Sequence, residues 1–184
     1  MAGNIIIKKR KQKVKPDFDI GELVVYGNSG VCKVSDIVCM PTPGSNEEKD
    51  YYKLEPVGNN KSQIYAVVGQ DKVMMRSIIT KELAQELMDS VEEIEELEVE
   101  NEKFREDTYK KIIQSGDCRE WFRMVKTLTR RNHERVEQGR KVTSTDERYL
   151  REAQHSLFTE LSIVLDRDIS EISEIIIDSC TEEF

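Results

Sequence analysis

The sequence predicts an α+β protein of two domains, a small β barrel followed by an all-α helical bundle. Up to about residue 78, apolar and polar residues alternate with the period of two that is typical of strands. Beyond residue 78 the apolar residues recur at spacings of three and four, which is the period of a helix. A chain of 184 residues is long enough for two domains of this size. We therefore expect a basic flexible tail at 1–15, the barrel at 16–78 and the helices at 79–180.

Five short runs, each bounded by turn-forming residues, predict the strands of the first domain. The runs are Glu22–Tyr26, Val31–Cys39, Tyr51–Val57, Ser62–Val68 and Val73–Ile78. The first turn contains Gly27 and Gly30, which can adopt the positive φ angles that a tight hairpin requires. Five strands in so short a segment are too few for a sandwich, which favours a barrel of SH3 or Tudor type.

The apolar spacing after residue 78 predicts a first helix with a single apolar face. That face is expected to consist of Leu83, Leu87, Val91, Ile94 and Leu97. The acidic run VEEIEELEVENE, residues 91–102, is interpreted as the solvated side of this helix rather than as an acid-base cluster.

Capping motifs predict three further helices. Asp117 opens a helix from Cys118 that Gly139 ends, and Thr143 or Ser144 opens one that reaches about Leu165. Asp168-x-x-Glu171 opens a short last helix, whose inward face is expected to consist of Ile169, Ile172, Ile176 and Ile177.

The sequence carries no pattern that predicts catalysis. It has no Gly-rich phosphate loop, no GxSxG and no HExxH. Its four cysteines form no CxxC pair and its two histidines lie far apart, so neither a disulfide framework nor a zinc site is predicted. We expect a protein that is not an enzyme, with no catalytic residues, no metal, no cofactor and no small-molecule substrate.

Hydropathy indicates a protein without a membrane segment. No apolar run approaches the ~18 residues that a spanning helix needs, and the N-terminal residues lack the apolar stretch of a secretory signal. We expect a soluble, cytoplasmic protein.

Charge is arranged in alternating blocks along the chain. Residues 103–151 carry a net charge of +6, whereas residues 91–102 carry −7 and residues 152–184 carry −8. Two interpretations of the basic block stay open at this point. Its cations either form weak surface pairs with the acidic neighbours or make a patch that binds phosphate groups.

Several segments resemble a known family. FDIGELVVYGNSGV, YYKLEPV and IYAVVGQDKVMMR are similar to the N-terminal domain of the CarD/CdnL family, bacterial regulators that bind RNA polymerase. That domain also occurs in the transcription-repair coupling factor. The later segment with Gly116-Asp117 and TSTDERYL, residues 143–150, resembles the helical C-terminal domain of the same family. The likeness covers about residues 18–165.

This resemblance implies a transcription regulator with two binding surfaces. The Tudor-like domain would pair a strand with the β subunit of RNA polymerase, through a surface made of Met40, Ile64, Tyr65 and Val67. The helices would contact promoter DNA at the upstream edge of the bubble, mostly through its backbone, and so modulate the stability of the open complex. The DNA-facing residues would be Phe104, Arg105, Lys110, Arg130, Arg131, Arg148 and Arg151.

The wedge that the family inserts into opened DNA differs in this chain. Where members often carry a tryptophan, four residues before the position of Tyr109, this chain has Arg105, with Phe104 adjacent. An apolar wedge from Phe104 is physically possible.

Two other classes of function stay open. One is a protein-protein adaptor of the same fold whose helices do not contact DNA. The other is an RNA-binding SH3-like module, which would need exposed aromatic residues on the barrel.

Overall fold

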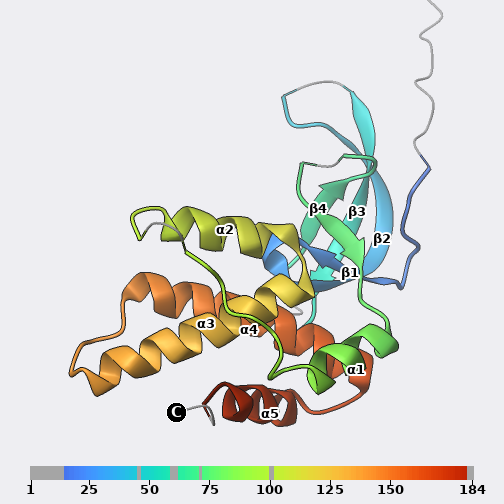
Figure 1. Ribbon diagram of the computed structural model, residues 1–184. Helices are drawn as coiled ribbons and strands as arrows, with labels where there is room; N and C mark the ends of the chain where they lie inside the picture. Colours follow the sequence, from blue (N-terminus) through green and yellow to red (C-terminus); the bar gives the residue numbers. More distant parts are fainter. Residues whose placement is uncertain (1–14, 45–46, 59–61, 71, 100–101, 182–184) are drawn as a thin grey trace, which may run out of the picture.

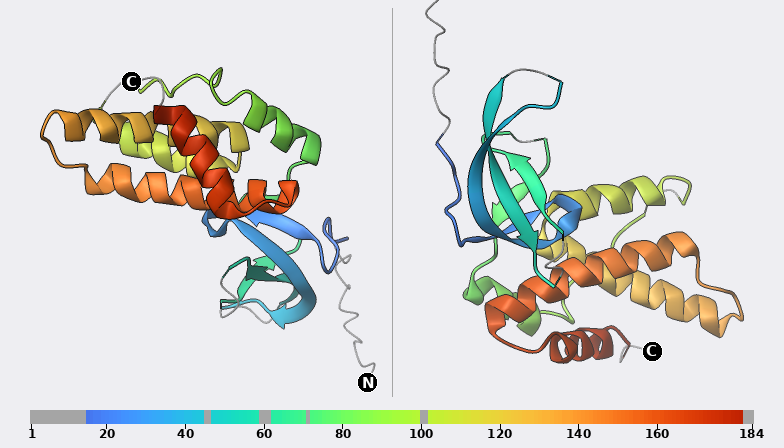
Figure 2. Two further views of the ribbon diagram at one scale, coloured as in Figure 1. Left: turned by 90° about the horizontal axis from the view of Figure 1, so that it is seen from below. Right: turned by 180° about the vertical axis from the view of Figure 1, so that it is seen from behind.

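The computed structural model of the chain describes residues 15–44, 47–58, 62–70, 72–99 and 102–181 (Figure 1). A β-sheet lies against one side of a group of helices, and Figure 2 shows the same two layers from below and from behind. The basic N-terminal tail predicted at 1–15 lies outside the described residues except for Lys15.

The sheet consists of five antiparallel strands in the spatial order β4-β3-β2-β1-β5. The strands are β1 (Leu23–Tyr26), β2 (Val31–Pro41), β3 (Glu48–Pro56), β4 (Ile64–Val67) and β5 (Met75–Ser77). All five predicted strands are present, but the barrel that they were expected to form is not closed. Within the described residues β4 pairs with β3 alone and β5 with β1 alone, so the sheet stays open at both edges. Short outer strands of four and three residues leave little length for closure.

The first hairpin has the predicted turn. Gly27 has a φ of 45° and Gly30 a φ of 67°, and residues Gly27–Ser29 form a short 3₁₀ turn, η1. A side chain on Gly27 would also collide with Val73, because an added Cβ would lie 2.7 Å from its Cγ1. The turn therefore needs glycine both for its backbone angle and for close packing.

Each face of the sheet is covered differently. On one face Val24, Cys32, Val34, Tyr52 and Leu54 form a small core within the sheet domain, with Phe18 packed against it. On the other face Val25 and Val31 join the main core, which belongs to the helices. The sheet is thus attached to the helices through a continuous apolar contact.

The helical part contains five helices within the described residues. They are α1 (Lys81–Asp89), α2 (Arg105–Ser115), α3 (Cys118–Glu137), α4 (Ser144–Leu165) and α5 (Ile169–Thr181). The predicted caps are confirmed: the side chain of Asp117 accepts hydrogen bonds from the backbone of Arg119 and Glu120, and that of Thr143 accepts one from Asp146. Trp121 of α3 is fully buried among the helices.

The prediction of a helix through residue 97 is wrong. α1 ends at Asp89, and the segment 91–99, which we call the strap, continues as a turn and irregular chain across α3 (Figure 1). Val91 and Ile94 are nevertheless buried, whereas Leu83 is exposed. In α5 likewise Ile172 and Ile176 are buried as predicted, but Ile169 is exposed and Cys180 takes an inward position.

Candidate functional site

The first candidate surface is the outer edge of β4. The backbone N–H of Val68 donates to the carbonyl of Asp50 on β3, at 2.9 Å. Because successive residues of an antiparallel strand direct their backbone groups to opposite sides, Ala66 and Ile64 also face β3. The N–H and C=O groups of Tyr65 and Val67 therefore point away from the sheet. No described strand pairs with them.

Three of the four residues predicted for this surface share a face. Val67 lies opposite Tyr51, which lies opposite Val38. Tyr65 and Met40 follow on the same face, because each is two residues away along its strand. Tyr65 is 44% exposed.

The fourth residue, Ile64, lies on the opposite face and packs against the sheet's own core. Its side chain is therefore separated from those of Met40, Tyr65 and Val67. The resemblance indicated residues of β4 but did not separate its two faces.

The second candidate surface is made by α2, α3 and α4. We call Arg105, Arg130, Arg131, Arg148 and Arg151 together the arginine surface. Each of these residues forms an ion pair with a carboxylate of the same chain. The structure thus contains the cations that the sequence predicted, together with partners for them.

Arg105 and Arg131 converge on a buried carboxylate. Asp146, at the start of α4, is 0% exposed, and its oxygens lie 3.4 Å from Nε of Arg105 and 3.2 Å from Nε of Arg131. Glu102 lies on the solvent side of this group, and its two oxygens accept hydrogen bonds from both Nη atoms of Arg131, at 2.6 and 2.7 Å. These hydrogen bonds from Arg131 lower the pKa of Glu102 to about 2 and raise the pKa of Arg131. Arg105 and Arg131 therefore hold α2, α3 and α4 together.

Arg148 is more accessible to solvent than Arg105 and Arg131. It donates to Glu106 of α2 at 2.6 Å, and its guanidinium lies over the ring of Tyr149, 4.5 Å from the ring centroid. The hydrogen bond that Arg148 donates to Glu106 raises the pKa of Arg148. Both members of this pair are about half exposed, so solvent screens their attraction.

The other predicted residues are two arginines with different partners, a lysine and a phenylalanine. Arg130 binds Glu96 of the strap at 2.6 Å and Glu134 of α3 at 3.2 Å. Arg151 of α4 is 76% exposed and lies 3.5 Å from Glu147, and Lys110 of α2 is also exposed. Phe104, directly before α2, is 60% exposed, which is unusual for so large an apolar side chain.

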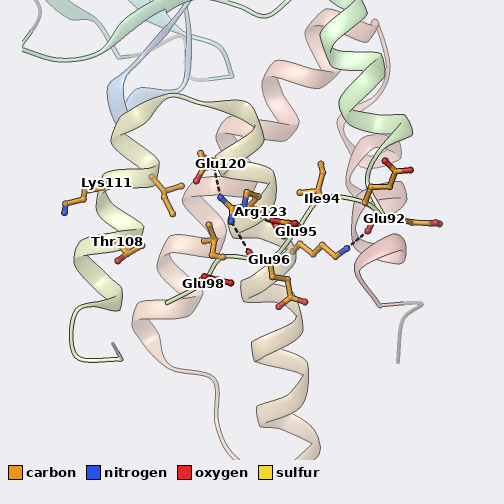
Figure 3. A pocket seen from close by; sticks show the side chains of 13 residues that line it. Glu92, Ile94, Glu95, Glu96, Glu98, Thr108, Lys111, Glu120 and Arg123 are labelled. Carbon is orange, nitrogen blue, oxygen red and sulfur yellow. Dashed lines mark hydrogen bonds and ion pairs between the residues drawn. The ribbon is translucent and has the colours of Figure 1, made fainter. Parts of the chain in front are cut away.

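The strap crosses α3 beside a cleft of about 850 Å³ (Figure 3). Arg123 of α3 reaches the strap and donates to the backbone carbonyls of Glu95 and Glu96, at 3.2 and 3.1 Å. Lys126 donates to the carbonyl of Glu92 at 2.9 Å. The acidic run is thus fastened through its backbone, and its side chains remain largely exposed.

Sequence reasoning allowed for acidic neighbours as partners of these arginines but did not identify which carboxylates they bind, and it missed the pair of Arg76 with the buried Glu160. Several of these partners lie 29 to 84 residues away in the sequence, so local spacing could not identify them. A signal did exist for the buried pair. Arg76 follows the apolar run VMM, and Glu160 lies within the apolar run LFTELSIV. A charged residue inside such a run indicates a buried partner.

The tyrosines argue against an RNA-binding face on the sheet. Tyr51 and Tyr52 are buried, and the hydroxyl oxygen of Tyr52 accepts hydrogen bonds from the backbone of Asp17 and Phe18. Only Tyr65 among the four tyrosines of the sheet domain is exposed. Stacking of several bases would need more exposed rings than this.

The described part of the chain has neither a cluster of metal-ligating side chains nor a membrane-spanning helix. It contains no group of three His, Cys, Asp or Glu side chains that could hold a metal ion. It also contains no helix with the length and hydropathy to cross a membrane.

Two family models match the chain. The model described as CarD-like/TRCF RID domain matches residues 18–79, and the model described as CarD, C-terminal domain matches residues 83–177. No curated protein matches the chain. The first match includes β4 and the second includes the whole arginine surface.

Proposed function

The chain belongs to the CarD family of RNA polymerase-interacting transcription regulators, and from this we propose that the β4 edge binds the polymerase β subunit while α2, α3 and α4 contact promoter DNA. The protein would then act by binding, without catalysing a reaction, in the bacterial cytoplasm where polymerase works. Its effect would be on the stability of the open promoter complex.

One observation carries the polymerase half of the proposal. The outward N–H and C=O groups of Tyr65 and Val67 have no partner strand among the described residues. An open edge of this kind is a template for an extended segment of another protein, which adds as a further strand. The side chains of Tyr65 and Val67 on the edge strand would give specificity, and Met40 lies on the same face of the sheet, two strands further in.

The DNA half is supported by position and exposure. Arg148, Arg151 and Lys110 are exposed and lie on α2 and α4, so they can approach phosphate groups. Phe104 is the better candidate for the wedge at the edge of the bubble. Arg105 is bound to Glu102 and Asp146, whereas Phe104 is solvent-exposed at the start of the same helix. Preferential binding of opened DNA would shift the promoter equilibrium towards opening.

The adaptor alternative is favoured by a different observation. Every member of the arginine surface already has an intramolecular carboxylate partner. Each phosphate contact would have to replace or share such a partner, which reduces its net gain. A helical surface that is neutralised in this way could instead serve a protein partner.

A salt titration separates the two functions. Binding of the full chain to a forked promoter fragment is measured with polymerase present, at several salt concentrations. The DNA function predicts a steep loss of affinity as salt rises, and the double variant Arg148→Glu/Arg151→Glu should reduce that slope by about two. Binding to isolated β subunit should be the same for wild type and variant. If the chain binds polymerase but shows no DNA contact at low salt, the adaptor function is correct.

A further inference from the structure

A buried carboxylate lies at the junction between the sheet and the helices. Glu160 is 0% exposed and belongs to α4. Arg76 of β5 donates to its two oxygens from both Nη atoms, at 2.6 and 2.8 Å. The backbone N–H of Ile79, in the link to α1, donates to Glu160 at 2.9 Å, and the thiol of Cys118 does so at the same distance. One side chain thus receives bonds from the sheet, the link and α3.

Arg76 is held from further directions. Its Nε donates to the carbonyl of Gly116, in the turn between α2 and α3, at 2.6 Å. Its guanidinium also lies over the ring of Trp121, 5.7 Å from the ring centroid. Burial disfavours the charge on Arg76, but the hydrogen bonds with Glu160 outweigh this and raise its pKa. The bidentate pair therefore fixes direction as well as distance.

These contacts have no equivalent in the arginine surface. The arginine-surface pairs join parts of the helices and of the segment between α1 and α2, whereas Arg76 with Glu160 connects β5 to α4. β5 pairs with β1, at the opposite edge of the sheet from β4. The pair therefore adds a directional contact to the apolar contact that Val25 and Val31 make with the helices.

We propose that Arg76 and Glu160 form an interdomain clamp that holds the β4 edge and the arginine surface in one fixed relative orientation, so that binding of polymerase strengthens binding of DNA. The second half rests on the proposed function. With a fixed orientation, polymerase bound to β4 places the helices at a defined point on the promoter. With a loose orientation, the same local contacts would be spread over many positions, and the effective concentration of the helices at the DNA would fall.

Two variants loosen the clamp in different ways. Glu160→Gln keeps the shape of the side chain but removes the charge that faces Arg76. Arg76→Lys keeps the charge but removes the planar fork and the Nε bond to Gly116. Glu86→Gln and Arg119→Lys are the matched controls, because they make the same changes in a pair that reaches neither the sheet nor the arginine surface. Arg76→Lys also serves if Glu160→Gln does not fold.

The orientation is measured on the free protein by NMR residual dipolar couplings of backbone amides. In the wild type one alignment tensor should fit both the sheet, residues 23–56, and the helices α3 and α4. In a clamp variant the two groups should need different tensors while each still fits its own fold. A single tensor that fits both groups in both variants would overturn the proposal.

The functional consequence is measured as the gain in affinity for forked promoter DNA that polymerase provides. In the clamp variants this gain in affinity should be smaller than in the wild type by a factor of at least about ten. Their affinities for polymerase alone and for DNA alone should match those of the controls. A full gain in a variant with two tensors would overturn the functional half. If even the wild type does not bind polymerase, the proposed function fails, whereas the orientation measurement still decides the clamp.

Discussion

β4 and the arginine surface present two different kinds of polar group to a partner. The outward backbone groups of Tyr65 and Val67 have no partner in the described chain, so a new strand would satisfy them directly. The arginines already bind carboxylates, and two of them surround the buried Asp146. A partner of β4 adds bonds, whereas a partner of the arginine surface has to exchange them. The sheet edge is therefore suited to affinity, and the helices to a weaker, salt-dependent contact.

The largest expected effect comes from removing the buried carboxylate under the arginine surface. Asp146→Asn would leave Arg105 and Arg131 without the charge that they enclose. We expect a loss of about 3 kcal/mol in the free energy of unfolding, because breaking a buried ion pair leaves an uncompensated charge. Urea denaturation measures this loss. Glu134→Gln, which removes an exposed partner of Arg130, is the control, and an equally small loss for Asp146→Asn would show that the group is not structural.

A smaller effect is expected from a substitution that prevents another strand from pairing with the open edge of the sheet. Val67→Pro removes an N–H that points away from β3, so the ladder with β3 remains intact and the fold should be stable. Affinity for polymerase should fall about tenfold, which corresponds to about 1.4 kcal/mol. Val67→Thr keeps the N–H and a similar shape, and it should bind nearly as well as the wild type. If polymerase binds through side chains alone, without adding a strand, the two variants should instead bind it with equal affinity.

Acid should weaken the outer part of the arginine cluster. The pKa of Glu102 lies at about 2 in the folded protein, below its ordinary value of 4.5. Its stabilising contribution is therefore complete above about pH 4.5 and is lost as the pH falls towards 2. Because Glu102 is more than half exposed, we expect less than about 1 kcal/mol. The difference in unfolding free energy between wild type and Glu102→Gln should shrink over this pH range. A difference that stays constant over this pH range would contradict a stabilising role for the ionised Glu102 side chain.

The smallest effect concerns an arginine that is bound but exposed. Glu106→Gln removes the charge that competes with phosphate for Arg148. The affinity for promoter DNA should rise about twofold at low salt, and the rise should disappear at high salt. Glu86→Gln, which frees Arg119 from its partner on α1, is the control for the change in net charge. An unchanged affinity for Glu106→Gln at low salt would favour the adaptor function.

Local patterns predicted most of the secondary structure but not the closure of the sheet. Strand alternation and capping residues act over a few positions, and the observed strands and caps follow them. Closure depends on whether β4 and β5 meet, which no local pattern records. The prediction that the first helix extends through residue 97 was wrong for a related reason. Val91 and Ile94 keep a helical spacing, but their segment is fastened to α3 by Arg123 and Lys126, and it does not continue α1.

The candidate surfaces were predictable to different degrees. The resemblance indicated the strand β4, and the register then separated Ile64 from Met40, Tyr65 and Val67. The basic block indicated cations, but several of their partners come from other helices or from the segment between α1 and α2. The two interpretations of that block, surface pairing and phosphate binding, therefore could not be separated from sequence.

The strap also has a consequence for how the chain is made. The cations that hold its carbonyls follow it by 27 to 34 residues in the sequence. A ribosome therefore releases the acidic segment before the side chains that fasten it exist. Until α3 has emerged, this part of the nascent polypeptide has none of those cations to bind its carbonyls. The order of synthesis thus makes α3, and not α1, the element that determines when the acidic segment acquires its native path.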